Sequence, residues 1–236
     1  MQHASYLERR GQIEAYFDRT AAQAWERLTS DAPVGRIRAT VRAGRDEMRR
    51  TLLSWLPPDM SGQRLLDAGC GTGALAAVAA SRGASVVAID LSPTLVQLAR
   101  DRWQADPLSN TVTGKIEFLS GDMLDPALGH FDHMVAMDSL IHYEQSDIVR
   151  ALHALSSRCR HSMLFTIAPR TPLLAAMHRV GRWFPRSDRS PSLEPIDALR
   201  LDQDLGPGLH EGRWQRTRTQ RISRGFYISQ ALELRR

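Results

Sequence analysis

The sequence contains little cysteine, and no apolar run in it is long. Its 236 residues include two cysteines, Cys70 and Cys159, which are too few for a disulfide framework and lack the spacing of a metal-binding pair. No apolar run approaches the roughly 18 residues of a transmembrane helix, and the polar N-terminus does not resemble a signal peptide. We therefore expect a cytoplasmic chain in a reducing compartment, with no protein-bound metal and no transmembrane segment.

Lysine is almost absent as well. Lys115 is the only lysine, so nearly all of the 31 basic residues are arginines, and they outnumber the 26 acidic residues to give a net charge of +5. Arginine forks bind carboxylates and phosphates in a bidentate manner. The composition therefore favours an acidic partner, although charge alone does not distinguish a small carboxylate from nucleic acid.

A glycine-rich loop follows a short apolar run at residues 64–68. Gly69, Gly71 and Gly73 alternate in this loop, and an alanine-rich stretch after them predicts a helix. Glycines at a strand-to-helix turn let the backbone approach a ligand, and the N-terminus of the helix favours negative charge. Through Gly69, Gly71 and Ala74 the loop also fits the dinucleotide-binding fingerprint, which leaves that alternative open.

An acidic residue distinguishes this loop from a phosphate-binding loop. Asp67 stands two residues before the first glycine. A carboxylate at this position opposes a pyrophosphate but suits an ammonium group, and S-adenosylmethionine has an ammonium, a sulfonium and no phosphate. The loop therefore resembles motif I of class I S-adenosylmethionine-dependent methyltransferases.

The rest of the chain alternates between predicted strands and helices. Continuous apolar runs predict parallel strands that are buried on both faces, and the last two strands alternate in polarity and predict an antiparallel pair. The predicted strands are residues 64–68, 85–90, 115–120, 131–138, 163–169, 214–222 and 226–234. This order predicts the α/β class I methyltransferase fold, a Rossmann-like sandwich around a seven-stranded, mostly parallel sheet.

We expect a helical cap at residues 1–60, followed by a methyltransferase domain at residues 61–236. An apolar, arginine-rich insertion at about 170–195 predicts a lid after the fifth strand, and we expect a helix at 195–205 that ends before the Gly-Pro-Gly of residues 206–208. In the cap, Ile37, Val41, Met48, Leu52 and Trp55 recur mostly at three- and four-residue steps, which predicts one apolar helix face.

Ligands of open α/β sheets bind outside the carboxyl ends of the strands, and acidic residues occur at several of these ends. Asp90 ends the second predicted strand and is placed to accept hydrogen bonds from ribose hydroxyls. In S-adenosylmethionine-dependent methyltransferases an acid after the third strand commonly meets the adenine amino group, and Asp122 and Met123 match this pattern. The cofactor-binding candidates are Asp67, Gly69, Gly71, Gly73, Asp90, Leu91, Asp122, Met123 and Asp138.

Taken whole, the chain resembles the magnesium-protoporphyrin IX O-methyltransferases of bacteriochlorophyll synthesis. The resemblance is carried by residues 16–20, 37–45, 66–73, 138–143, 166–171 and 226–233. It implies methyl transfer from S-adenosylmethionine to one propionate of magnesium-protoporphyrin IX, an interaction with the porphyrin-binding subunit of magnesium chelatase, and peripheral association with the photosynthetic membrane. Chlorophyll-type relatives carry a tyrosine about where this chain has Thr29, so no tyrosine can act at that position here.

Such a substrate is a large apolar disc with two carboxylates. A carboxylate nucleophile is already ionised at neutral pH, because its reference pKa is about 4, so no strong base is needed. Catalysis then depends on in-line positioning and on the removal of water. We predict His142 as the first catalytic candidate and Tyr16 as the second. The substrate-binding candidates are Arg38 and Arg42, whose spacing puts them on one helix face, and Arg186 in the predicted lid; the alternative is that the arginines form a solvated surface.

Three other functions are weighed against this one. A related methyltransferase could act on another small acid or on a quinone precursor. A nucleic-acid methyltransferase would use the basic surface, but amino-methylating members usually carry an Asn/Asp-Pro-Pro-aromatic run where this chain has Asp138-Ser139-Leu140-Ile141. A non-catalytic S-adenosylmethionine-binding or porphyrin-carrying protein should have lost the glycine loop or Asp90, and both are present.

Overall fold

The computed structural model describes residues 4–18, 35–170, 193–211 and 214–236. Most of the predicted lid, including Arg186, and the position of Thr29 lie outside these residues.

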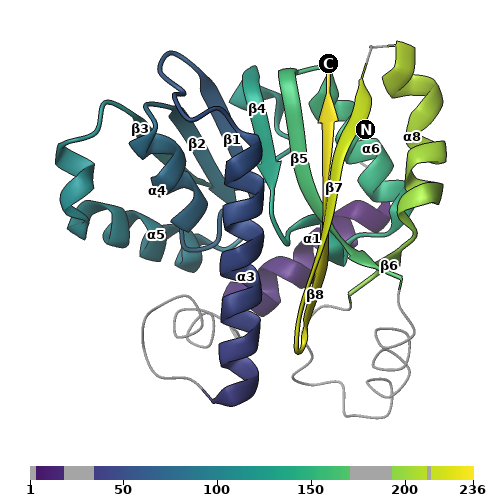
Figure 1. Cartoon of the computed structure of the whole chain (residues 1–236), viewed down its shortest axis with the longest axis horizontal. Helices are drawn as coiled ribbons and strands as arrows, with labels where there is room; N and C mark the ends of the chain where they lie inside the picture. Colours follow the sequence, from purple (N-terminus) through teal and green to yellow (C-terminus); the bar gives the residue numbers. More distant parts are fainter. Residues whose placement is uncertain (1–3, 19–34, 171–192, 212–213) are drawn as a thin grey trace.

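A single sheet forms the centre of the molecule, with strand order β3-β2-β1-β4-β5-β8-β7 (Figure 1). The first five strands along the chain pair in parallel, and β8 pairs antiparallel with β5 and β7. Their bounds are β1 Arg64–Ala68, β2 Ser85–Asp90, β3 Lys115–Ser120, β4 Phe131–Ala136, β5 Cys159–Pro169, β7 Gln215–Arg224 and β8 Tyr227–Arg235. The seven predicted strands are confirmed. A two-residue strand, β6 (Pro195–Ile196), pairs with β5 beside this path and was not predicted.

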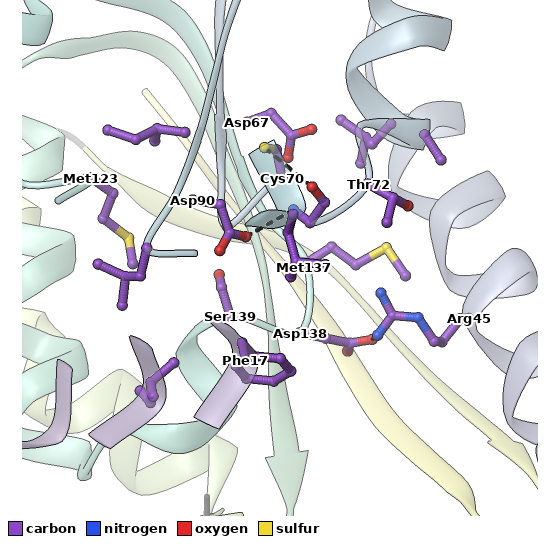
Figure 2. Close-up of a pocket in the computed structure, with 18 of the residues that line it drawn as sticks. Phe17, Arg45, Asp67, Cys70, Thr72, Asp90, Met123, Met137, Asp138 and Ser139 are labelled. Carbon is purple, nitrogen blue, oxygen red and sulfur yellow. Dashed lines mark hydrogen bonds and ion pairs between the residues drawn. The ribbon is translucent and has the colours of Figure 1, made fainter. Parts of the chain in front are cut away.

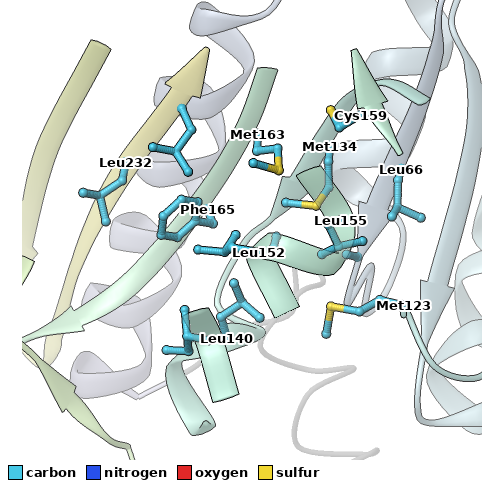
Figure 3. Packing of buried hydrophobic residues seen from close by; sticks show 14 of the residues in the cluster. Leu66, Met123, Met134, Leu140, Leu152, Leu155, Cys159, Met163, Phe165 and Leu232 are labelled. Atoms are coloured by element: carbon cyan, nitrogen blue, oxygen red, sulfur yellow. The ribbon is translucent and has the colours of Figure 1, made fainter. Parts of the chain in front are cut away.

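Helices cover each face of the sheet, because successive side chains of a buried strand point to opposite sides. On one face, α3 (Arg36–Trp55), α4 (Ala74–Ser81) and α5 (Pro93–Ala105) share a hydrophobic cluster with Leu65. On the other face, α1 (Ala4–Tyr16), α6 (Gln145–Ser156) and α8 (Ala198–Glu211) pack around Leu66, Met134 and Phe165 (Figure 3). Short 3-10 turns at Pro107–Asn110, Pro126–Leu128 and Leu140–His142 complete the chain. The predicted α/β sandwich is confirmed.

Helix α3 runs across the front of the sheet in Figure 1 and lies close to β7 and β8. A Cβ atom added at Gly44 would lie 2.5 Å from the Tyr227 ring, so the glycine lets the helix approach this closely. Met48 and Leu52 are fully buried as predicted, but Ile37 is 58% exposed, because the N-terminal part of the predicted apolar face does not reach the core. The boundary at residue 60 stays a prediction, although one hydrophobic cluster joins α3 to β1.

Helix α8 corrects two sequence-based expectations. The predicted helix at 195–205 begins later, because Pro195 and Ile196 form β6, and it continues through Gly206-Pro207-Gly208 to Glu211. Leu201, Leu205 and Leu209 recur at four-residue steps and are almost fully buried, so packing against the core outweighs the low helix propensity of glycine and proline. Strand β4 also ends at Ala136, two residues earlier than expected, and Asp138 has a positive φ of 54° that a strand cannot accommodate.

A buried histidine in β4 gives the fold a predicted pH dependence. His133 is 3% exposed, and its ring nitrogens contact Ser162 Oγ at 2.7 Å and Gln63 Oε1 at 3.1 Å. Burial, with a smaller contribution from His161, lowers the pKa of His133 from 6.5 to about 4. Between these two pH values the imidazole is protonated in the unfolded chain but not in the folded chain, so the contribution of His133 to the free energy of unfolding falls as pH drops through this window.

We expect the thermal midpoint of His133→Gln to fall less, or to rise more, between pH 7 and pH 5 than that of the wild type, because the variant lacks this contribution. The control is His130→Gln, which removes an exposed histidine and should leave the pH dependence unchanged. Thermal unfolding followed by circular dichroism measures all three slopes. Identical slopes for wild type and His133→Gln would show that His133 does not contribute to the pH dependence.

Candidate functional site

A cavity of about 240 Å³ opens at the carboxyl edge of the parallel strands (Figure 2). The glycine loop after β1 and residues at or beyond the ends of β2, β3 and β4 line it, and α1 and α3 contribute further side chains. The predicted site residues that the structure brings together in this wall are Arg42, Asp67, Gly69, Gly71, Asp90, Leu91, Met123, Asp138 and His142. The convergence expected of strand ends in this fold therefore occurs.

The glycine loop needs backbone conformations that other residues rarely adopt. Gly69, Gly71 and Gly73 have φ values of 84°, 52° and 78°. A Cβ atom at Gly69 would also lie 2.4 Å from the Cβ of Ser139, which lines the same cavity. Gly73 is the N-cap of α4 and is not among the described residues that line the cavity. The absence of a side chain at Gly69 therefore lets the loop lie close to Ser139, in the segment that follows β4.

Asp67 is buried in this wall without full hydrogen-bonding. The residue is 2% exposed, and no group in the described part of the chain donates a hydrogen bond to its Oδ2 atom. Burial and, to a smaller extent, the nearby charge of Asp90 raise the pKa of the Asp67 carboxyl to about 7. A buried acceptor of this kind suits a ligand that brings a cationic donor.

Asp90 ends β2 and is fixed by backbone N–H groups. Gly71 N–H donates to Oδ2 at 2.8 Å, which is the dashed line beside Asp90 in Figure 2, and Ser92 N–H donates to Oδ1 at 3.0 Å. Burial nevertheless raises the pKa of Asp90, since it outweighs these hydrogen bonds. Each carboxylate oxygen can accept more than one hydrogen bond, so the geometry remains compatible with the predicted contact to ribose hydroxyls.

The predicted adenine side of the cavity is only partly supported. Met123 lines the wall with Ile89, Leu91 and Leu95, which gives an apolar surface. Asp122, in contrast, is not among the described lining residues.

The carboxylate of Asp122 is directed to α1. Its Oδ1 accepts a hydrogen bond from Tyr6 Oη at 2.8 Å, and its Oδ2 pairs with Arg10 at 3.0 Å. These contacts join Asp122 to α1, and the predicted contact of Asp122 with the adenine amino group stays a prediction.

Helix α1 supplies an aromatic cover that the sequence did not indicate. Phe17, just beyond the helix, lines the cavity, and its ring lies edge-on to His142 with a centroid distance of 5.9 Å. His142 is 6% exposed at the end of the 3-10 turn after β4. Tyr16 is not among the described lining residues and packs edge-on against Phe17 at 5.2 Å. The structure therefore favours His142 over Tyr16 as the group that meets a ligand.

The arginines of α3 differ in whether they reach the cavity. Arg42, Arg45 and Arg49 line the cavity, whereas Arg38 is exposed and is not among the described lining residues. Arg45 was not among the predicted substrate-binding residues, yet its Nη1 donates to Asp138 Oδ2 at 2.7 Å. Helical spacing identifies a face but not the part of it that reaches the site, so this distinction could not come from the sequence. Within the described residues, no group of three or more His, Cys, Asp or Glu side chains is arranged to hold a metal ion.

Comparison with known proteins places these features in a family. Residues 136–236 match the family model described as the C-terminus of magnesium-protoporphyrin IX methyltransferase, and residues 65–162 match a methyltransferase domain. The chain is 48% identical over 233 residues to the magnesium-protoporphyrin O-methyltransferase of Rhodobacter capsulatus, covering 98% of this chain and 99% of that one. It is 27% identical to the Synechocystis protein of the same name, over 94% of each chain.

A solved structure agrees in fold. The crystal structure of magnesium protoporphyrin IX methyltransferase from Synechocystis with bound SAH superposes with a TM-score of 0.82 and 24% identity, covering 96% of this chain and 99% of that chain. With the near-complete match to the R. capsulatus sequence, this chain belongs to the magnesium-protoporphyrin O-methyltransferase family.

Proposed function

We propose that the protein transfers a methyl group from S-adenosylmethionine to one propionate carboxylate of magnesium-protoporphyrin IX, giving the monomethyl ester and S-adenosylhomocysteine. The observation that carries this proposal is the charge arrangement of one cavity. The buried carboxylate of Asp67 and the half-buried carboxylate of Asp90 line it together with Arg42, Arg45 and His142. It can therefore accept a cationic donor and an anionic acceptor at the same time.

The donor half of the cavity fits S-adenosylmethionine. Asp67 offers a buried acceptor for the ammonium group, and Asp90 offers one for the ribose hydroxyls. Met123 and Leu91 give an apolar surface for the adenine ring. Gly69 and Gly71 let the backbone approach the ligand closely. When bound, S-adenosylmethionine supplies an electrophilic methyl group.

The acceptor half requires positioning rather than a strong base, because a propionate is already ionised at neutral pH. Arg42 and Arg45 bring positive charge to the wall and would attract the carboxylate. His142 is placed to hydrogen-bond and orient it, and Phe17 covers His142 and excludes water from the reacting atoms. Removing water strengthens these electrostatic contacts, since the local dielectric falls.

The family resemblance supports two further parts of the proposal. We propose that the protein receives its substrate from the porphyrin-binding subunit of magnesium chelatase and associates peripherally with the photosynthetic membrane. None of the helices in the described segments has a stretch long and apolar enough to cross a bilayer.

The proposed reaction is tested by mass spectrometry with S-adenosylmethionine that carries a deuterated methyl group. With magnesium-protoporphyrin IX we expect one labelled methyl ester per porphyrin. A carboxylate acceptor also requires that the dimethyl ester of the porphyrin take up no label. Faster labelling of a quinone precursor or another small acid than of the porphyrin would favour the alternative methyltransferase.

The elevated pKa of Asp67 predicts that the affinity for S-adenosylmethionine depends on pH. Without ligand the carboxyl has a pKa of about 7, and a bound ammonium favours the ionised form. Affinity should therefore be greatest above pH 7 and weaken as pH falls below it, by up to about tenfold per pH unit.

Calorimetric titration between about pH 5.5 and pH 7 measures this dependence, below the range of about 7.7–8.0 where the ligand's own α-amino group titrates. Asp67→Asn should bind more weakly and without the pH dependence. A wild-type affinity that stays constant across this range would remove Asp67 from the ammonium site.

His142 gives a mechanistic prediction. His142→Ala should lower kcat by about 10²-fold with little change in affinity for S-adenosylmethionine, in the range of acid–base and positioning groups. His142→Asn, which can still donate a hydrogen bond, should retain more activity if the role is positioning. Tyr16→Phe should have little effect, because Tyr16 lies behind Phe17. Steady-state kinetics decide, and full activity of His142→Ala would exclude the residue from the mechanism.

A further inference from the structure

The carboxylate of Asp138 is the centre of a buried hydrogen-bond network in the cavity wall. Its side chain is 5% exposed and pairs with Arg45 of α3 at 2.7 Å. Tyr227 Oη of β8 donates to it at 3.1 Å. Thr166 Oγ1 of β5 lies at 3.2 Å from Oδ1, and Ser229 Oγ of β8 at 3.3 Å. Side chains from three separate elements thus converge on one carboxylate (Figure 2 shows its contact with Arg45).

Asp138 is also held in a backbone conformation that non-glycine residues rarely adopt. Its φ is 54°, and it is the one non-glycine residue with positive φ in the described part of the chain. Its own backbone N–H donates to Thr166 Oγ1 at 2.7 Å. Strain of this kind persists where the surroundings over-determine it, and it concentrates at functional sites.

The neighbours of Asp138 connect this network to the two halves of the cavity. Ser139 donates from Oγ to the carbonyl of Ala68 at 2.8 Å and sits against Gly69, so it positions the strand-four segment on the cofactor loop. His142 follows in the 3-10 turn Leu140–His142. Arg45 reaches the cavity from α3, and its side chain is 18% exposed. The fixed carboxylate therefore sets the position of a cationic side chain and of the segment that carries His142.

We propose that Asp138 is a positioning residue for methyl transfer, which fixes Arg45 and the His142 segment on the acceptor side of the cavity instead of binding the cofactor. Tyr227 belongs to the same hydrogen-bond network, because its hydroxyl donates to Asp138 and Gly44 of α3 leaves room for its ring. The inference rests on the proposed function and differs from the sequence-based assignment of Asp138 to cofactor binding. The two assignments predict opposite results for the affinity of the cofactor.

Asp138→Asn tests the proposal, because it keeps the size of the side chain and removes the charge that fixes Arg45. We expect kcat/KM for magnesium-protoporphyrin IX to fall about tenfold or more, while the dissociation constant for S-adenosylmethionine changes less than about threefold. Arg45→Gln should have a similar effect. The double variant should be little worse than either single variant, since the two residues act as a unit.

Asp132→Asn is the matched control, because it removes a carboxylate in β4, at the end of the strand away from Asp138, where Arg64 N–H donates to it at 2.8 Å. It should leave both constants unchanged, and thermal midpoints of all variants separate stability from activity. Where Asp138→Asn does not fold, Tyr227→Phe removes one donor to Asp138 and should give the same split between the two constants.

A loss of affinity for S-adenosylmethionine of tenfold or more in Asp138→Asn would make Asp138 a cofactor ligand and overturn the proposal. Unchanged kcat/KM in Asp138→Asn or Tyr227→Phe, or additive effects in the double variant, would also overturn it. These outcomes are distinct from a failure of the proposed function, in which the wild-type protein forms no porphyrin ester.

Discussion

Two carboxylates, the buried Asp67 and the half-buried Asp90, lie close together where the parallel strands β1 and β2 end, and the site depends on this arrangement. Parallel pairing brings Asp67 and Asp90 to the same edge of the sheet. Asp90 is stabilised there by backbone N–H groups of the glycine loop and of Ser92, whereas Asp67 retains an unsatisfied buried oxygen. The resulting negative potential disfavours phosphate and favours a cation. The choice of cofactor therefore follows from the position of two acids at the ends of adjacent strands.

Positive charge in the cavity wall comes from a helix that precedes the alternating strands and helices of the sheet. Helix α3 lies on the sheet through Met48 and Leu52 and places Arg42 and Arg45 in the cavity wall. Asp138 joins this helix to β5 and β8, and Ser139 beside it joins the same segment to the cofactor loop. Hydrogen bonds thus join α3 to the segment Asp138–Ser139, and this segment to the end of β1 before the glycine loop. Such a connection suits a reaction that depends on the alignment of donor and acceptor.

The sequence predicted the sheet well because parallel strands buried on both faces are continuous apolar runs. It also placed the glycine loop, Asp67, Asp90 and His142 correctly at the carboxyl edge. It could not predict the features that depend on segments far apart in the chain. Tyr6 and Arg10 bond to Asp122, which lies far from both in the sequence. Helical spacing could not distinguish the exposed Arg38 from Arg45, which is partly buried. Helix α8 continued through Gly-Pro-Gly because three leucines pack into the core, an effect that local propensity does not contain.

The central claim is that buried acids make this glycine loop a site for a cation, although its spacing also fits a dinucleotide fingerprint. Competition binding tests this claim most directly. The purified protein is saturated with labelled S-adenosylmethionine and titrated with unlabelled S-adenosylhomocysteine or with NADH. S-adenosylhomocysteine, which keeps the ammonium group, should displace the label, and NADH should not displace it even in large excess. Displacement by NADH at concentrations similar to those of S-adenosylhomocysteine would contradict the account.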